Sequence, residues 1–554
     1  MIIIGAGISG LANAALLSKA GLSCCVIEKE PIIGGYLQGF RRKDFIFDSA
    51  IHWLNQCGEE GMVTKIWKLI GTDYPKTVSM PNIHRFKSSE IDYTLTNNPE
   101  KLKEQLIKDF PHEKKGIEKL FKVAQKLGKA SIKFKDLIRT TESMSLFEKA
   151  LHGLKVFKTI IPMIPYAMYS GDKGITKGLN KYFFKDKKLH KLYSSEKDLL
   201  SCIFPIAWAY IKDYQMPVKG GGQAYPAWLK HVTEYYNNDI ITNAKVKEIT
   251  FDNNKTVNGI IFDKKSETHS LKAKYVIAAC DVDTLYKKML PKGVVSDKFL
   301  HNLDEADLYY SGATVSIAIN CPAKELGITD ELVSITRDDI DRHEHESGDP
   351  LKSAISVISP SERDNSLAPE GNGTINIYIP ADIKYNNYWQ TDGFENGEYI
   401  RGEAYKKHKK EFAQILIERV EKELNIDIQS HILFLDISTP ITYYRYTGNK
   451  NGSIMGARPG KKNMQLGVAH YKTPIRNLFL SGHWAELGGG VPIAVQSAIN
   501  CSLLVLQNEN KALFKLLADY TDGKIPIEKV YQSKLLKEYD NSWEQNLTPA
   551  EKKS

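Results

Sequence analysis

The sequence has no apolar run that we expect to cross a membrane. A spanning helix needs about 20 mostly apolar residues, and lysine, proline or an acidic residue interrupts the apolar runs here well short of about 18. The first predicted strand starts at residue 2, which leaves no room for the charged and apolar regions of a signal peptide. These absences predict a cytoplasmic protein whose membrane association, if there is any, is peripheral.

Cysteine is scarce and shows no pairing pattern. The chain has seven cysteines, mostly in apolar surroundings, at positions 24, 25, 57, 202, 280, 321 and 501. An odd, scattered set is typical of buried thiols in a reducing compartment and not of a disulfide framework. His343 and His345 lie in the acidic stretch 338–346, but their spacing is not that of a familiar metal site. We therefore expect a solvated loop there and no metal.

Charge is modest in total but uneven along the chain. The net charge is +9 over 554 residues, and we expect no nucleic-acid partner. Between 149 and 191 the chain has ten lysines and only two acidic residues, interleaved with large apolar residues that include Tyr182-Phe183-Phe184. Such a segment suits an anionic membrane surface, but a helix pair with a solvated lysine face explains it equally well. Nothing in the sequence indicates an oligomeric state.

The clearest motif lies in the first fifty residues. An apolar strand at 2–4 leads into a turn with Gly5, Gly7 and Gly10, a helix follows, and a second apolar strand ends at Glu28. This is the pattern of a dinucleotide-binding βαβ unit. The three glycines allow a tight turn, close approach of a pyrophosphate, and close packing of helix on strand. The helix N-terminus attracts the diphosphate, and Glu28 is placed to bind the adenosine ribose.

The residues after this unit indicate which dinucleotide is bound. Glu28-Lys29 is followed by Gly34-Gly35 and then by His52-Trp53. This arrangement resembles the flavin-binding N-terminus of the amine oxidase and phytoene desaturase superfamily. The resemblance implies FAD, with Lys29 beside the acid and Gly34-Gly35 at the start of the wall of the FAD site. Only one dinucleotide fingerprint is present, so we expect any NAD(P)H to bind transiently at the flavin, as an electron donor.

Residues 217–300 predict a return of the chain to the flavin domain. A glycine run at 220–222 precedes a predicted helix (225–236), a strand (240–241), the segment 244–249, a hairpin through 257–260 and a strand (275–279). In the superfamily this order brings the chain back beside the first strand, which implies that Val246 meets the adenine through its backbone. Asp281 then either lies near the cofactor or caps the following helix.

A second flavin-like motif lies near the C-terminus. A predicted strand ends at Gly482-His483, and a glycine run then starts a helix at Gly490-Val491. The motif resembles one in phytoene desaturases, carotenoid isomerases and retinol saturases. The resemblance implies that these four residues contact the flavin, whose pyrimidine oxygen the backbone N–H groups of the helix start can hold.

Three side chains are candidates for catalytic proton transfer. His483 stands where many superfamily members carry an acidic residue. We consider three roles for it: contact with FAD, donation of a proton, or structural packing against Trp484. His52 and Glu486 are weaker candidates. The sequence does not choose among the three.

Together these motifs predict an α/β fold. A Rossmann-like FAD-binding domain of the glutathione reductase type carries a mixed-sheet substrate domain and a helical cap. We assign 1–85, 217–300 and 437–507 to the flavin domain, 86–216 to the cap, 301–436 to the substrate domain and 508–554 to a C-terminal helix and a polar tail that is disordered from about residue 541. The substrate domain has predicted strands at 311–320, 353–358 and 374–379 and a helix at 405–424.

The resemblance implies an FAD-dependent oxidoreductase that acts on CH–CH or conjugated C=C bonds of a lipophilic isoprenoid or polyene. The flavin carries such chemistry, so no catalytic triad or metal is needed. Three alternatives stay open: a redox-neutral carotenoid isomerase, an amine oxidase with an aromatic cage formed by Trp53, Tyr444 and Tyr446, and a non-enzymatic prenyl-binding chaperone similar to the Rab GDP-dissociation inhibitors.

Overall fold

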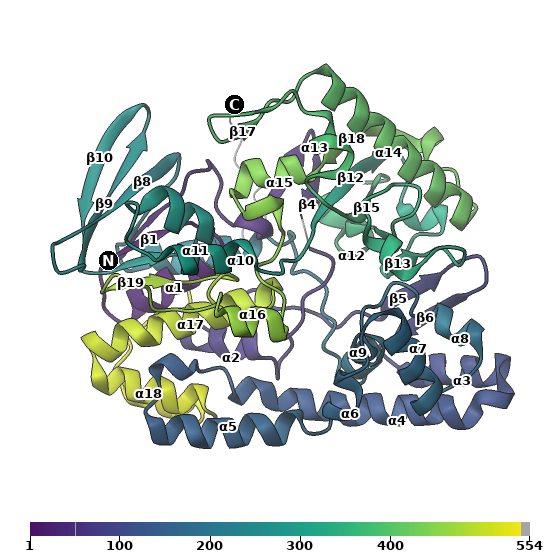
Figure 1. Cartoon of the computed structure of the whole chain (residues 1–554), viewed down its shortest axis with the longest axis horizontal. Coiled ribbons are helices and arrows are strands. Elements are labelled where there is room, and N and C mark those ends of the chain that lie inside the picture. Colours follow the sequence, from purple (N-terminus) through teal and green to yellow (C-terminus); the bar gives the residue numbers. More distant parts are fainter. Residues whose placement is uncertain (50, 545–554) are drawn as a thin grey trace.

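A five-stranded parallel sheet forms the centre of the first domain. The computed structural model describes residues 1–49 and 51–544. The strand order is β19 (Leu478–Leu480), β11 (Val276–Ala278), β1 (Ile2–Ile4), β2 (Cys25–Ile27) and β7 (Asp239–Ile241). Ile3 pairs with Val26 on one side and with Ile277 on the other. Three segments that are distant in sequence thus lie side by side, as Figure 1 shows, and the predicted α/β fold is confirmed.

Helix α1 (Ile8–Lys19) is buried along its whole length. It packs against α17 (Gly490–Glu509) and α10 (Ala224–Tyr235), and α17 also packs against α2 (Met62–Ile70). The side chain of Ser502 in α17 donates a hydrogen bond to Asn13 Oδ1 in α1, with an O···O distance of 3.0 Å. The N-terminal and C-terminal motifs are therefore joined through one helix pair.

The composition of α17 corrects one expectation. In the described part of the chain this is the one helix that could cross a membrane by length and composition, although we expected every apolar run to be shorter. However, 67% of its apolar window is buried inside the protein. Packing against α1 and α2 accounts for its apolar character.

A three-stranded antiparallel sheet lies beside the parallel one. It consists of β8 (Ala244–Phe251), β9 (Val257–Lys264) and β10 (Glu267–Lys272). The predicted hairpin through 257–260 is wrong, because these residues lie inside β9 and the turns fall at 252–256 and 265–266. A Cβ atom at Gly259 would overlap the carbonyl oxygen of Leu271 in β10. The glycine therefore allows close approach of two strands and does not mark a turn.

The substrate domain is built on a seven-stranded mixed sheet. Its order is β18 (Ile432–Ser438), β12 (Ser311–Ile319), β15 (Gly373–Ala381), β14 (Ile355–Ile358), β13 (Leu332–Ile335), β5 (Asn82–Lys87) and β6 (Asp92–Thr96), with β13 and β5 parallel and the other pairs antiparallel. Helix α14 (Glu403–Leu424) contributes buried Phe412, Leu416 and Val420 to the core of this domain. The proposed domain boundary at 85/86 falls inside β5, so the first flavin segment ends before Asn82.

A layer of helices runs along the base of the molecule in the view of Figure 1. It contains α3 (Pro99–Asp109), α4 (Lys114–Ser131), α5 (Leu146–Ile160), α6 (Ile164–Ala167), α7 (Gly171–Tyr182), α8 (Lys187–Lys191) and α9 (Leu199–Tyr210). The predicted helical region is thus confirmed. Phe183 and Phe184 are buried in the core of this layer, so the expectation that they face a membrane is wrong.

Smaller elements complete the chain. They are β3 (Gly39–Arg42), β4 (Phe45–Asp48), α11 (Asp297–Asp304), α12 (Pro360–Arg363), α13 (Tyr385–Gln390), β16 (Phe394–Glu395), β17 (Glu398–Tyr399), α15 (Pro440–Thr447), α16 (Lys461–Leu466), α18 (Lys511–Thr521) and α19 (Ile527–Gln532). The C-terminal part therefore has two helices and not one. Trp543 N–H still donates to Asp73 Oδ2, contrary to the predicted disorder, and residues 545–554 of the predicted tail lie outside the described residues.

The expectations for the cysteines and for the acidic stretch 338–346 can be compared with the structure. All seven cysteines are free thiols, five of them buried and two half-buried, as predicted. His345 is fully buried and accepts a hydrogen bond from the Arg337 N–H, so the stretch 338–346 is not the entirely solvated loop that we expected.

Candidate active site

The glycine-rich turn between β1 and α1 leaves an open cradle. A Cβ atom at Gly5, whose φ is +102°, would lie 2.7 Å from the carbonyl oxygen of Ala279, and one at Gly10 would overlap the carbonyl oxygen of Gly5. A Cβ at Gly7, in contrast, would have no described atom within 4 Å. Gly5 and Gly10 are therefore required by the fold, whereas Gly7 lines free space. This is the geometry that a closely approaching diphosphate needs.

The helices that follow the two glycine motifs have no side-chain cap at their N-termini. Gly7 is the N-cap residue of α1 and Gly489 that of α17, and neither helix has an acidic residue in its first turn. The free N–H groups at such a terminus carry partial positive charge and bind anions. Gly490 (φ +81°) and Val491 begin α17. The two termini thus offer donors from opposite ends of the chain.

The Gly34-Gly35 doublet lies directly on the glycine-rich turn. Gly34 N–H donates to the carbonyl oxygen of Ala6 at 2.8 Å, and Gly34 forms an isolated parallel β-bridge with Gly7. A Cβ at Gly35 (φ +57°) would lie 3.3 Å from the Cα of Gly7. Close by, the buried Gln223 Oε1 has no hydrogen-bond partner among the described residues. An open cradle with an unsatisfied buried acceptor fits a bound dinucleotide whose hydroxyl and N–H groups can donate.

Glu28 lies at the end of β2, where the motif predicts it. Its carboxylate accepts hydrogen bonds from Ala6 N–H (2.6 Å) and Glu30 N–H (2.9 Å). Burial raises the pKa of Glu28, and these two hydrogen bonds oppose that shift. Ala244 N–H donates to the Glu28 carbonyl oxygen at 2.8 Å, which places Val246 two residues further along β8. The two residues assigned to the adenosine half are therefore neighbours. Lys29 instead reaches the carbonyl oxygen of Arg445.

A buried serine cluster connects the two glycine motifs. Ser9 Oγ lies 2.7 Å from Ser481 Oγ and 3.1 Å from Ser497 Oγ, and Gly482 N–H donates to Ser497 Oγ at 2.6 Å. Gly482 (φ +89°) lies two residues beyond the end of β19, and these contacts hold it against the start of α1. The structure thus brings both sequence-predicted flavin motifs to one place.

The three proton-transfer candidates have different surroundings. His483 packs edge-on against Trp484 with ring centroids 5.3 Å apart, and burial lowers its pKa to about 4. Glu486 accepts a hydrogen bond from the Tyr471 hydroxyl at 2.8 Å, and burial raises its pKa. His52 is half-buried, and its buried Nδ1 has no partner in the described part of the chain. Of the three, only His52 has a fully buried side-chain nitrogen without a hydrogen-bond partner in the described part of the chain.

Three tyrosines, one of them beside His52, are not among the site residues predicted from the sequence. The ring of Tyr378 on β15 lies 5.2 Å from the His52 ring, and Tyr443 on α15 lies 6.0 Å from Tyr36. Helix α15 packs on β12 and β18 of the substrate-domain sheet, although we assigned 437–507 to the flavin domain. Tyr443 Oη donates to the carbonyl oxygen of Ser49 at 3.1 Å and so links this helix to the flavin domain. Burial raises the pKa of Tyr36, Tyr378 and Tyr443. Neither aromatic periodicity nor a motif marks the two tyrosines that come from the substrate domain.

Two ionisable residues, Arg363 and Asp48, lie close to His52. The Arg363 guanidinium donates to the backbone carbonyl of His52, and burial lowers the pKa of Arg363 to about 10. Burial raises the pKa of Asp48 to about 6, although its carboxylate accepts a hydrogen bond from Gly222 N–H at 2.8 Å. Burial and then the nearby Arg363 charge lower the pKa of His52 to about 4. The imidazole is therefore neutral at physiological pH.

Two other predicted groups are resolved by their contacts. Asp281 is buried, and it accepts hydrogen bonds from Thr284 N–H (2.8 Å) and Lys450 N–H (3.0 Å), which supports the capping interpretation. The suggested aromatic cage is not assembled. Trp53 packs on Tyr214 at the cap, whereas Tyr444 packs on the β16–β17 hairpin and Tyr446 is exposed.

Solved structures and curated proteins resemble the chain over most of its length. An oxidoreductase from Methanosarcina mazei superposes with a TM-score of 0.55 at 16% identity, covering 92% of this chain and 99% of that one. Putrescine oxidase bound to putrescine gives 0.53 at 15% identity, covering 92% and 98%. These likenesses show the fold.

Curated proteins are similar in sequence. All-trans-retinol 13,14-reductase from Danio rerio is 25% identical over 94% of this chain and 88% of its own length. Chloroplastic prolycopene isomerase from Daucus carota is 24% identical over 90% and 79%. The 4,4'-diapolycopen-4-al dehydrogenase of Metabacillus indicus is 21% identical over 92% and 97%. A family model described as flavin containing amine oxidoreductase matches residues 8–506. With both glycine motifs assembled around one cradle, the chain belongs to the flavin-containing amine oxidoreductase family.

Proposed function

We propose that this FAD-dependent oxidoreductase acts on CH–CH or conjugated C=C bonds of a lipophilic isoprenoid or polyene. The similar proteins whose names refer to retinol, prolycopene and diapolycopenal support this substrate class, because each match spans most of both chains. The fold alone would not choose it, since putrescine oxidase has the same fold.

The observation that carries the proposal is the neutral character of His52, of Tyr378 beside it, and of the Tyr36–Tyr443 pair. The imidazole has a pKa of about 4, and burial raises the pKa of Tyr36, Tyr378 and Tyr443. All four groups are therefore uncharged at physiological pH. A site whose imidazole and phenol side chains are uncharged suits a hydrocarbon better than an ammonium group, whose burial is costly without an anionic partner and which the nearby Arg363 charge would repel.

The residues present fit FAD. The cradle at Gly7 and the free N-terminus of α1 would hold the diphosphate, Glu28 the ribose and Val246 the adenine, while Gly482 and the start of α17 would border the ring. Lys29, Gly34, Gly35, His483, Gly490 and Val491 complete the proposed set. Bound FAD supplies hydride transfer at its N5 atom, in either direction.

His52 is the proposed proton-transfer residue. In dehydrogenation its neutral imidazole accepts the proton that leaves the substrate carbon, and in reduction the same nitrogen returns it. Arg363 fixes the His52 backbone, and Tyr378 packs beside the ring. His483, packed on Trp484, and Glu486, bonded to Tyr471, act as positioning groups in this proposal.

Replacing His52 by glutamine is expected to lower kcat about 100-fold, the lower range for loss of a general acid–base, without loss of flavin. His84→Gln is the matched control. His84 is also half-buried, with a pKa of about 4 and a buried, unpaired Nε2, but it stacks on Phe86 in β5. Equal activity of the two variants under saturating substrate would remove His52 from the mechanism.

Product analysis tests the substrate class and the direction of reaction. The purified protein is incubated with retinol, with a cis-lycopene, with a saturated isoprenoid analogue and with putrescine, each with and without NAD(P)H. A gain or loss of two hydrogens on a polyene supports the proposal and assigns its direction. Transient reduction by NAD(P)H is the proposed electron supply for saturation. A mass-neutral shift of double-bond geometry would instead identify an isomerase, and turnover of putrescine alone would overturn the proposed substrate class.

The same proposal includes peripheral attachment of a cytoplasmic enzyme to a membrane through 149–191. Its support is the lysine excess of this segment and the lipophilic substrate class. The buried Phe183 and Phe184 restrict the contact to the first part of the segment.

A further inference from the structure

Helix α5 carries its large apolar side chains on the outside of the protein. Thr159 is the only buried residue among its fifteen. The exposed fraction is 85% for Leu146, 73% for Phe147, 58% for Leu154 and 54% for Phe157. Surface helices normally turn such residues inward, so a set of this size marks a contact surface.

The exposed residues form one stripe. At about 100° per residue, Leu146, Phe147, Leu151, Leu154 and Phe157 fall within an arc of about 140°, and Thr159 points away from it. Exposed Ile161, Ile164 and Met168 continue the apolar surface across α6. We call residues 146–168 the apolar strip. Lys155 lies just beyond one border of the stripe, Lys158 lies inside it close to that border, and Lys149 lies beyond the other border.

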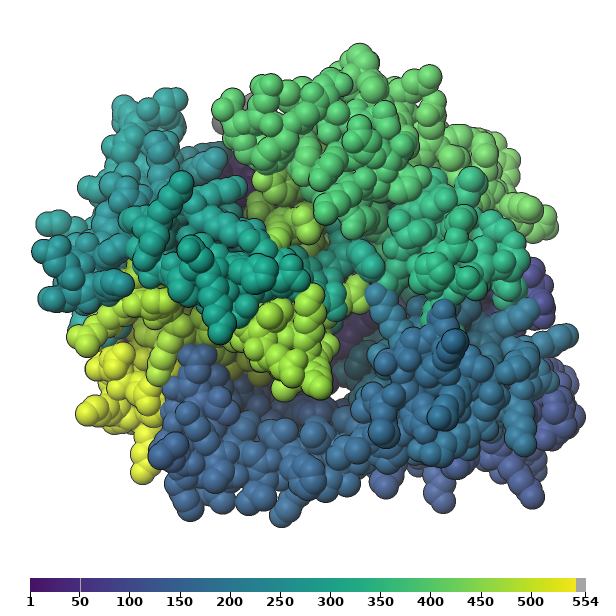
Figure 2. Space-filling model, in the orientation of Figure 1, coloured from purple at the N-terminus to yellow at the C-terminus, as the bar shows by residue number. Residues whose placement is uncertain are grey.

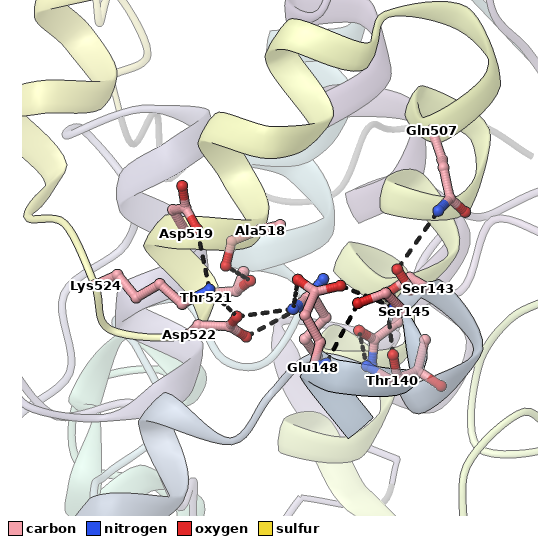
Figure 3. A network of polar contacts seen from close by, with 12 residues as sticks. Thr140, Ser143, Ser145, Glu148, Gln507, Ala518, Asp519, Thr521, Asp522 and Lys524 are labelled. Carbon is pink, nitrogen blue, oxygen red and sulfur yellow. Dashed lines mark hydrogen bonds and ion pairs between the residues drawn. The ribbon is translucent and has the colours of Figure 1, made fainter. Parts of the chain in front are cut away.

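Polar contacts hold the strip in place without covering it. Ser145 and Glu148 form a capping box at the start of α5. Glu148 also accepts from the buried Arg139 at 2.6 Å, and Arg139 pairs with Asp522 at the end of α18 at 2.9 Å. Figure 3 shows Glu148 and Ser145 facing Asp522 across this network. The helix is thus anchored by its inner side and its N-terminus, while its apolar side stays outside.

The surface is hollowed next to the strip. In Figure 2 an opening lies between the α5–α6 segment, α16 and the cap helices. Met464 of α16 is also largely exposed. Met163 and Tyr166, in contrast, turn from the strip into the core of the cap. The opening thus adjoins the apolar strip.

We propose that the apolar strip lies in the plane of an anionic lipid bilayer and that the opening beside it admits the lipophilic substrate from that bilayer. The charge pattern favours lipid over a second copy of the chain. Lysines border the strip, and juxtaposed copies would bring these like charges together, whereas anionic headgroups attract them. In-plane helices have this arrangement of apolar face and flanking lysine. The second part of the proposal rests on the proposed function; the first part does not.

Co-sedimentation with vesicles tests the surface. The full chain is mixed with phosphatidylcholine vesicles with or without phosphatidylglycerol. The triple variant Phe147→Ser, Leu154→Ser, Phe157→Ser is expected to bind at least about tenfold more weakly to both vesicles. The variant Lys149→Gln, Lys155→Gln, Lys158→Gln is expected to lose about 100-fold on anionic vesicles only. The matched control, Val78→Ser, Leu351→Ser, Leu433→Ser, removes exposed apolar residues elsewhere and keeps full binding.

Two outcomes would overturn the docking surface: equal vesicle binding by the wild type and the serine triple variant, or a lipid-independent dimer that this variant dissociates. Flavin content and the near-UV spectrum of each variant verify that it is folded. For the entrance, substrate is supplied either in vesicles or in detergent micelles. The serine variant is expected to slow turnover only with vesicles. Equal slowing in both would refute the entrance, and absence of polyene turnover by the wild type in micelles would refute the proposed function but leave the docking surface standing.

Discussion

Replacing Gly7 by alanine is expected to give a folded, colourless protein. A Cβ at this position meets no described atom within 4 Å, so the apoprotein has no reason to unfold. The same methyl group would occupy the space proposed for the diphosphate and push it away from the backbone N–H donors at the start of α1. Hydrogen bonds to a charged group contribute about 1.5–3 kcal/mol each. Flavin affinity should therefore fall at least about tenfold for each bond lost, and activity with it.

Gly10→Ala is the matched comparison. Its methyl group would overlap the carbonyl oxygen of Gly5 and touch the Ala279 side chain, so this variant should lose folded protein and not only flavin. The measurements are the flavin-to-protein absorbance ratio and the thermal unfolding of both variants. A Gly7→Ala protein that retains its full complement of flavin would place the diphosphate elsewhere.

Loss of Arg139 is expected to have the second large effect, this time on stability. Its side chain is 2% exposed and pairs with Glu148 and with Asp522, whose side chain is only 10% exposed. Removing one member of a buried ion pair leaves an uncompensated charge and typically costs about 3–5 kcal/mol. Lys524 also contacts Asp522 at 2.9 Å and offsets part of this cost. We therefore expect Arg139→Met to lower the free energy of unfolding by about 3 kcal/mol and to increase proteolysis between α4 and α7.

Arg85→Met serves as the control, because Arg85 makes a two-hydrogen-bond pair with Asp92 that is exposed to solvent. Exposed pairs contribute less than about 1 kcal/mol. Denaturant titration followed by tryptophan fluorescence compares the two variants. Similar losses from both would show that the Arg139 network does not anchor α5.

The pKa of Glu148 determines how the contact between Glu148 and Arg139, which anchors α5, responds to acid. Burial opposes ionisation, but hydrogen bonds from Ser145 and Arg139 outweigh it and lower the pKa of Glu148 to about 2. A carboxylate with a lowered pKa stabilises the folded state above its ordinary pKa of about 4.5, and the stabilisation is lost as the pH falls from there to about 2. The stability difference between wild type and Glu148→Gln should therefore be constant near neutral pH and shrink within this window. A difference independent of pH would contradict the assignment.

Local signals predicted the flavin domain well. The spacing of Gly5, Gly7 and Gly10 between two apolar strands reports contacts within one βαβ unit, and both glycine motifs meet where the resemblance implied. The predicted hairpin at 257–260 is wrong because Gly259 allows the close approach of a neighbouring strand, and no local sequence pattern reveals such a contact. Likewise, the burial of the apolar run in α17 cannot be deduced from the run itself, because it arises only when α1 packs against this helix.

The surroundings of the reacting centre were less predictable. Tyr378 and Tyr443 come from a strand and a helix that pack in the other domain, and Tyr378 meets His52, and Tyr443 meets Ser49, only after the two domains pack together. The unsatisfied Nδ1 of His52 and the open space at Gly7 are properties of the folded chain. Neither property can be deduced from residue type and spacing.

The visible spectrum of the purified protein, followed under anaerobic titration, tests the central claim most directly. The account predicts an oxidised flavin spectrum. It should bleach on addition of a saturated isoprenoid, or bleach with NAD(P)H and return on addition of a conjugated polyene such as retinol. A flavin that responds to putrescine and to no polyene, or a protein that binds no flavin even when FAD is supplied, would contradict it.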